Sequence, residues 1–551
     1  MNTTATLYAE TPVNRPRRPA ARPVPGLVAR IWTRPWRALR GEFGSALWVP
    51  PCALLLLAAF PPLEWRGLEW LALAPLAAGL LGRRGSVAGW TAAGWGYGVL
   101  FFAVQFAWLH HAFVGLAGMA WWQFADAFAL LMAVLGLLPA AALGGARWLW
   151  RRWGLSPLVV LPVLLAGQDA LLGVFPFGGM AWGSLAGPQV GTWAARLVVP
   201  LLGGAGLVLL VALVGAGWGA WGWAMGVRGP GRASWAAGAA LAGVTLVCAW
   251  PAPVPYAPAN APRVPVLLVP GQLSIAQLNA QRDTPGPLRY YLARTMEALP
   301  GGAGHYPAAA PPRLVVWPES AVPGQVERGK TLVELSELGG LWGADLLLGS
   351  NGLEAGREYN SLYLVNGGRF DFLRYDKQRL VPFGEYVPAG FGWLFARKVT
   401  AGPGDYAAGS GPPVLAWRGT RLGLAICFES ILPAHVRAEV QAGAALLVAA
   451  ANDAWLTPAA RRQHLQITAL RGLAVGRDVV LVANGGWSGL LRGGRAVALE
   501  SDGTPLHVWA ALREGRTLYA RWGLLPLGLL SVGLLLGAWR PRRGGRPSRR
   551  T

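Results

Sequence analysis

The chain has 551 residues, of which 54% are hydrophobic and only 14% are charged. These charged residues are too few to cover the surface of a fully soluble protein of this length. Its net charge of +23 comes from arginines crowded at the two ends and in short gaps between apolar runs, whereas a nucleic-acid binder more often carries basic residues as one face with interleaved aromatics. The composition therefore excludes an ordinary soluble domain, argues against nucleic acid and predicts an integral membrane protein.

Long apolar runs, each close to the ~20 residues that cross a bilayer, dominate the first half of the chain. They predict a basic tail (1–45), a membrane domain with seven spans (46–250) and an eighth span (520–540) before a second basic tail (541–551). The predicted spans cover about 46–62, 67–82, 88–108, 120–145, 155–174, 197–223, 233–250 and 522–538.

Loop charges predict the orientation of these spans, because Lys and Arg in short loops stay on the cytoplasmic side. Cations follow spans two, four and six, namely Arg83, Arg84, Arg147, Arg151, Arg152, Arg228 and Arg232. Both termini are therefore expected in the cytoplasm, with the long segment between spans seven and eight outside.

After a Pro-rich linker (251–263), the segment 264–519 alternates short apolar runs with helical stretches. The predicted strands are 264–269, 313–317, 346–349, 422–426, 445–450 and 479–483, and the predicted helices are 332–338, 434–442 and 461–477. Buried strands separated by helices indicate a layered α/β domain. In such a domain the chemistry is expected where strands end.

Three reactive side chains each follow a predicted strand: Glu319 in Trp-Pro-Glu-Ser, Lys377 in Tyr-Asp-Lys-Gln, and Cys427 in Ile-Cys-Phe-Glu. Each has an ordinary alternative when taken singly. Glu319 alone is typical of a solvated carboxylate in a turn. Lys377 is one of only three lysines in the chain, and its position could be chance. Cys427 is compatible with a buried, inert thiol.

Together the three residues suggest acyl chemistry. A carboxylate can remove the thiol proton, the thiolate can attack a carbonyl, and an ammonium can stabilise the resulting oxyanion. Metal chemistry is the competing interpretation, but histidines of this segment such as His305, His464 and His507 are scattered and show no ligand spacing. No glycine-rich phosphate loop follows a strand in the required context. No metal and no cofactor are therefore predicted.

The order and wording of these motifs resemble the Glu-Lys-Cys triad of the carbon-nitrogen hydrolase (nitrilase) superfamily, which implies an αββα sandwich. With the membrane spans and the run Leu-Val-Pro-Phe-Gly-Glu-Tyr-Val-Pro (380–388), the chain is similar to the apolipoprotein N-acyltransferase family. The resemblance implies Glu319 as general base, Lys377 as oxyanion holder and Cys427 as nucleophile, supported by Glu385, Glu429 and Asn360.

By the same resemblance, a membrane phospholipid is the acyl donor and the N-terminal amine of a diacylglyceryl-cysteine apolipoprotein is the acceptor. It also implies a monomer in the bacterial cytoplasmic (inner) membrane with its catalytic domain on the extracytoplasmic side. The chain departs from the family at Phe428, where tyrosine is common, and at 269–273, where the usual polar sequence motif is missing.

Two rival hypotheses remain open at this stage. A membrane-anchored amidase or nitrilase acting on a small amide would share the same triad. A transporter or scaffold with an inactive outer domain would need few of these residues, and the intact triad argues against it.

Overall fold

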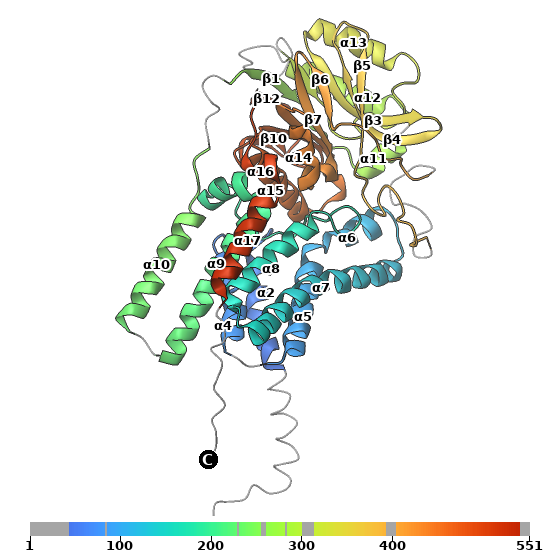
Figure 1. Cartoon of the computed structure of the whole chain (residues 1–551). Coiled ribbons are helices and arrows are strands. Elements are labelled where there is room, and N and C mark those ends of the chain that lie inside the picture. Colours follow the sequence, from blue (N-terminus) through green and yellow to red (C-terminus); the bar gives the residue numbers. More distant parts are fainter. Residues whose placement is uncertain are drawn as a thin grey trace, which may run out of the picture.

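The computed structural model describes residues 43–82, 85–228, 231–254, 261–281, 284–299, 313–392 and 404–539. The predicted basic tails, apart from 43–45, lie outside these residues, as do Arg83, Arg84 and positions 255–260 of the predicted linker. Figure 1 shows a bundle of helices with a mixed domain of strands and helices packed against one end of it.

The first half of the described chain is helical. Its elements are η1 (Phe43–Trp48), α2 (Val49–Ala59), α3 (Glu69–Ala72), α4 (Ala74–Leu81), α5 (Val87–Gln105), α6 (Trp108–His110), η2 (His111–Leu116), α7 (Trp121–Trp153), α8 (Pro157–Leu172), α9 (Trp193–Arg228) and α10 (Arg232–Ala249). Near the C-terminus, α16 (Leu518–Trp522) leads into α17 (Leu525–Ala538), which returns along the bundle (Figure 1).

Four helices of the described residues, α5, α7, α9 and α10, are long and apolar enough to cross a membrane. The other four predicted spans contain shorter apolar helices. In the first two of these spans, a local break shortens the helix. Helix α2 ends just before Pro61 and Pro62, and the second predicted span is divided into α3 and α4 at Leu73. The chain is a multi-pass membrane protein.

The sequence predicted that the basic residues after the fourth span lie in a loop, and this prediction was wrong. Arg147, Arg151 and Arg152 lie inside α7, whose last turn carries the latter two, where cations favour the negative end of the helix dipole. Arg147 is buried and donates from Nε (3.2 Å) and Nη2 (2.9 Å) to the carbonyl of Gly85. It therefore ties α7 to the start of α5.

The strands form two six-stranded mixed sheets. The first has the order β12 (Leu506–Ala511), β1 (Arg263–Leu268), β2 (Leu314–Val316), β3 (Asp345–Glu354), β4 (Arg357–Val365), β5 (Phe372–Asp376). The second has the order β11 (Arg495–Glu500), β10 (Ser488–Arg492), β9 (Val479–Asn484), β8 (Leu446–Asn452), β7 (Thr420–Ile426), β6 (Val414–Trp417). In each sheet three parallel strands, β1–β2–β3 and β7–β8–β9, are flanked by antiparallel ones.

The two sheets pack face to face between helices. Alternate strand residues point to opposite faces, so Val266 and Leu268 join the core between the sheets, whereas Leu267 packs under the outer helices. Outside the first sheet lie α12 (Gly286–Ala298) and α13 (Thr331–Trp342), preceded by α11 (Ile275–Ala280); outside the second lie α14 (Pro433–Gln441) and α15 (Pro458–Val475). The predicted layered α/β domain is confirmed as helix, sheet, sheet, helix.

Helix α15 also contacts the membrane domain. Its residues Ile467, Leu470 and Leu473 belong to the same apolar core as the bundle helices. Polar contacts add to this: Glu64 Oε1 accepts from Arg462 Nε (3.0 Å) and Gln466 Nε2 (2.7 Å). One helix thus lies between the second sheet and the bundle, and it joins the two parts.

Candidate active site

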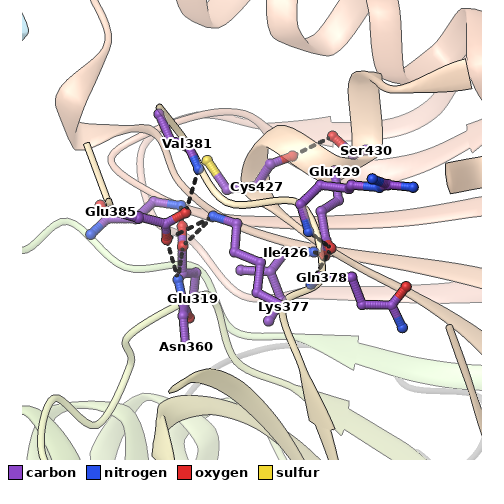
Figure 2. A network of polar contacts seen from close by, with 12 residues as sticks. Glu319, Asn360, Lys377, Gln378, Val381, Glu385, Ile426, Cys427, Glu429 and Ser430 are labelled. Atoms are coloured by element: carbon purple, nitrogen blue, oxygen red, sulfur yellow. Dashed lines mark hydrogen bonds and ion pairs between the residues drawn. The ribbon is translucent and has the colours of Figure 1, made fainter. Parts of the chain in front are cut away.

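The three predicted reactive residues come from both sheets. Glu319 lies in the loop after β2, Lys377 directly follows β5, and Cys427 directly follows β7. Because the parallel strands β2 and β7 end at the same edge of the sandwich, residues distant in sequence meet there. Figure 2 shows the resulting network of side chains.

A buried cluster of two carboxylates, an amide and an ammonium forms the centre of the site. Lys377 Nζ lies 3.0 Å from Glu385 Oε1 and 3.4 Å from Glu319 Oε1. Asn360 on β4 donates from Nδ2 to both of these oxygens, at 2.8 Å and 2.7 Å. The sequence-predicted residues Glu319, Asn360, Lys377 and Glu385 are therefore in direct contact (Figure 2).

Burial and neighbouring charges set the protonation of this cluster. Burial raises the pKa of Glu319, the Lys377 ammonium opposes that shift, and the Glu385 carboxylate adds to it. For Lys377, burial alone would lower the pKa, but Glu385 and Glu319 together more than offset it and raise the pKa. Lys377 is thus held as an ammonium, while Glu319 becomes a stronger base than an exposed glutamate.

Cys427 sits on a sharp turn. Strand β7 ends at Ile426, Cys427 has φ of +51°, and a short 3₁₀ helix, η3 (Cys427–Ile431), follows. A positive φ is strained for a residue with a Cβ, and such strain gathers at functional sites. Burial raises the pKa of the thiol, Glu319 raises it further and Lys377 opposes. The resting residue is therefore a thiol, which needs a base before it can attack a carbonyl.

Glu429 is fully buried but does not contact the Lys377 cluster. Its Oε1 accepts backbone N–H groups of Gln378 (2.7 Å) and Arg379 (2.9 Å), and its Oε2 accepts that of Ile426 (2.9 Å). The Tyr375 hydroxyl donates to the same carboxylate. Glu429 thus joins the segment that carries Lys377 to the turn that carries Cys427, and Figure 2 shows it on the other side of the lysine.

By the resemblance, residues 452–455 belong to a loop beside the nucleophile, but the contacts that strand β8 supplies to the cluster were not predicted. The backbone N–H of Asn452 donates to Glu319 Oε2 (2.8 Å), and Asn484 Nδ2 donates to Asn452 Oδ1 (3.0 Å). The next residue, Asp453, pairs with His464 on α15, at 2.9 Å between Oδ1 and Nδ1. The signal was the same as for the triad, a polar residue directly after an apolar strand. Among the described residues, no group of three or more His, Cys, Asp and Glu could hold a metal ion.

A cavity of about 820 Å³ contains Glu319, Lys377 and Cys427. Phe428, the departure from the usual tyrosine, also lines it and packs against the core of the bundle. The rest of its wall is largely apolar and includes Phe124, Phe128, Leu131 and Val134 of the membrane helix α7, together with Phe106 just after α5 and Trp182 between α8 and α9. The reactive cluster therefore opens into a space that membrane helices line.

Two mixed sheets between helices, with Glu, Lys and Cys at strand ends, define a carbon-nitrogen hydrolase domain joined to a helical membrane domain. The family model for carbon-nitrogen hydrolase matches residues 273–519, and the model for the apolipoprotein N-acyltransferase N-terminal domain matches residues 52–217. The apolipoprotein N-acyltransferase of Gloeobacter violaceus is 33% identical over an alignment of 524 positions, which covers 89% of this chain and 93% of that protein. That of Azotobacter vinelandii is 31% identical over an alignment of 584 positions, which covers 93% of this chain and 98% of that protein. The chain belongs to the apolipoprotein N-acyltransferase family.

Proposed function

We propose that the protein transfers an acyl chain from a membrane phospholipid, by way of a thioester on Cys427, to the N-terminal α-amine of a diacylglyceryl-cysteine apolipoprotein. The observation that carries this proposal is the cavity, which places Cys427 and the Lys377 cluster in one space with apolar side chains of membrane helices. Such a wall suits a fatty acyl chain, whereas a small amide would leave most of it uncovered. Membership of the family supports the same reaction.

In the first step Glu319 takes the thiol proton of Cys427, and the thiolate attacks the ester carbonyl of the phospholipid. The carbonyl oxygen becomes an oxyanion, which the Lys377 ammonium stabilises. When the tetrahedral intermediate collapses, the C–O bond breaks and the departing glycerol oxygen takes the proton from Glu319. The products are a lysophospholipid and an acyl thioester on Cys427.

In the second step the α-amine of the acceptor attacks the thioester carbonyl. Glu319 takes a proton from the attacking nitrogen, and Lys377 again stabilises the oxyanion. The C–S bond breaks, the thiolate recovers the proton and the acyl chain leaves as an amide. Because donor and acceptor are both lipid-anchored, a site beside the bilayer holds them at a high effective concentration.

For topology, we propose eight spans in the bacterial inner membrane, with both termini cytoplasmic, the segment 264–519 outside and the protein acting as a monomer. Arg151 and Arg152 at the end of α7 and Arg232 at the start of α10 support this orientation. In a Cys427→Ala background, a Leu341→Cys thiol on exposed α13 should react with a membrane-impermeant reagent in spheroplasts, and an Arg152→Cys thiol should not. The reverse pattern would overturn the orientation.

The reaction is tested by incubating the purified full-length protein with phospholipid labelled in its acyl chain and analysing its peptides by mass spectrometry. We expect an acyl adduct on Cys427, its loss in Cys427→Ala, and its retention in Cys248→Ala, which changes a thiol in α10. A diacylglyceryl-cysteine peptide should then release the label as an amide. Turnover of a small amide without any adduct from phospholipid would favour the amidase alternative and sink this proposal.

A further inference from the structure

A chain of buried polar side chains ends at the backbone carbonyl of Cys427. The Ser430 hydroxyl donates to that carbonyl at 2.8 Å. The hydroxyl oxygen of Ser430, Oγ, also lies 2.9 Å from His464 Nε2 and 3.1 Å from Thr468 Oγ1. The other ring nitrogen of His464, Nδ1, lies 2.9 Å from Asp453 Oδ1. Asp453, His464, Ser430 and Thr468 are each at most 2% exposed, so water does not satisfy them.

The number of hydrogens available along this chain decides which group donates in each hydrogen bond. The Ser430 hydroxyl has one hydrogen, and the Cys427 carbonyl can only accept, so that hydrogen is committed. His464 Nε2 must therefore donate to Ser430, and the second proton of the pair lies between His464 Nδ1 and Asp453 Oδ1. The Asp453–His464 pair thus holds a proton on each side of the imidazole ring, which corresponds to an imidazolium beside a carboxylate.

The charges around the ring agree with this assignment. Burial alone would lower the pKa of His464, but Asp453, the backbone of Cys427 and Glu319 raise it overall. The only other charged group that faces the pair among the described contacts is Arg461, whose guanidinium lies near Asp453 and donates to its carbonyl at 3.0 Å. The pair is therefore close to neutral as a unit.

We propose that His464, held as an imidazolium by Asp453, is a positioning residue for acyl transfer, because it fixes the Cys427 turn through the Ser430 hydroxyl. This inference rests on the proposed function. The turn has a positive φ at Cys427, so its conformation must be held by contacts around it. Ser430 holds the carbonyl at the start of η3, and Arg471 holds the one at its end, with Nε 2.7 Å from Ile431 O. Arg471 lies on α15, and Ser430, which lies within η3, contacts α15 through His464.

His464 has a second effect, on charge. The Asp453 carboxylate raises the pKa of the Cys427 thiol, and an imidazolium in contact with it cancels much of that effect. Loss of His464 therefore acts in two ways: it releases the turn geometrically, and it leaves a negative charge beside the thiolate that must form. Both effects slow thioester formation, and neither touches the apolar wall where the acyl chain is proposed to bind.

The test compares His464→Leu, which removes donor and charge, with His464→Gln, which keeps an amide donor but no charge. His507→Leu is the matched control, because His507 lies on β12 and hydrogen-bonds the Ala298 carbonyl instead. Two measurements are made on the full-length protein: the rate of Cys427 acylation as a function of the concentration of labelled phospholipid, which gives KM as well, and the pH profile of Cys427 alkylation by iodoacetamide. Circular dichroism and the thermal midpoint report folding.

We expect His464→Leu to lower the acylation rate roughly a hundredfold, the size of effect that small misplacements of a reacting group produce, with KM unchanged. His464→Gln should recover most of that loss, yet both variants should shift the alkylation profile to higher pH. His507→Leu should match the wild type. If His464→Leu does not fold, the alkylation profile of His464→Gln decides.

An acylation rate and alkylation profile equal to wild type in folded His464→Leu, or an unshifted profile in His464→Gln, would overturn the inference. A loss that appears only in KM would do the same, since it would place His464 in lipid binding. Alkylation needs no lipid substrate. If the wild-type protein forms no adduct from phospholipid, the proposed function fails, while the alkylation profiles still report on His464.

Discussion

Lys377 and Glu385 form a buried ion pair, with Nζ 3.0 Å from Oε1, and Glu319 is the more distant counter-ion at 3.4 Å. Glu385 is anchored in turn by the backbone N–H of Val381, 2.8 Å from its Oε2. The lysine therefore has a dedicated partner, and Glu319 is left with less of the ammonium's charge. This division separates Lys377, the proposed oxyanion holder, from Glu319, the proposed base, although both groups share one cluster.

The Glu385→Gln variant tests this division. Glu385 raises the pKa of Glu319, so its neutral replacement should lower that pKa and move the acid limb of the kcat/KM pH profile to lower pH. The weaker base should also slow acylation, by roughly ten- to a hundredfold. The measurement is acylation of Cys427 across pH. Glu337→Gln, which changes an exposed residue of α13, should leave the limb in place, and an unmoved limb in Glu385→Gln would contradict the division.

The thiolate of Cys427 should titrate in opposite directions in two variants. Its pKa is raised by burial and by Glu319 and lowered by Lys377. Glu319→Gln should therefore lower the pKa of the thiol, and Lys377→Met should raise it. Ultraviolet thiolate absorbance as a function of pH, with Cys427→Ala as the blank, measures both. Unchanged pKa values in both variants would show that burial alone controls the pKa of this thiol.

The strands before Glu319 and Cys427 were predictable because they are short apolar runs followed by a polar residue, whereas no such run marks β5, the strand before Lys377. Runs such as Leu422–Ile426 correspond to β7, and 445–450 correspond to β8. By contrast, β4 (Arg357–Val365) begins with Arg-Glu-Tyr-Asn, and β5 carries Arg374 and Asp376, so neither reads as a buried strand. These polar side chains are paired across the sheet, as in Ser361 with Asp376, and tertiary pairing of this kind is invisible to local periodicity.

The candidate site was predictable in its members but not in their contacts. Glu385 and Glu429 were both predicted from the resemblance of their motifs. In the structure Glu385 binds Lys377, whereas Glu429 binds backbone N–H groups on the other side of that lysine. His464 was considered only as a metal ligand, because nothing along the chain links it to Cys427. The link passes through Ser430, and only the packing of α15 against η3 creates it.

Contacts between α15 and the bundle should contribute measurably to stability. Glu64 accepts hydrogen bonds from Arg462 and Gln466, so Glu64→Ala leaves two donors without their partner and should cost about 1–3 kcal/mol. Glu64→Gln keeps one acceptor oxygen and should lose less. The midpoint of thermal unfolding in detergent, followed by circular dichroism, checks this order. Equal midpoints for Glu64→Ala and the wild type would mean that the other contacts of α15 join the two parts without a contribution from Glu64.

The length of the acyl chain should be read by the membrane-helix wall of the cavity. Leu131 on α7 lines that wall, so Leu131→Trp fills space that a long chain would occupy. Forcing a chain past the larger ring should cost about 1–3 kcal/mol, which is roughly a ten- to a hundredfold loss in kcat/KM.

Phospholipids with short acyl chains end before the obstruction and should react with Leu131→Trp nearly as they do with the wild type. Leu137→Trp is the matched control, because Leu137 is exposed on the same helix and does not line the cavity. The measurement is the rate of Cys427 acylation by a series of phospholipids of increasing chain length. A loss equal for all chain lengths would mean that the substitution disturbs α7 itself, and the acyl chain would then have to lie elsewhere.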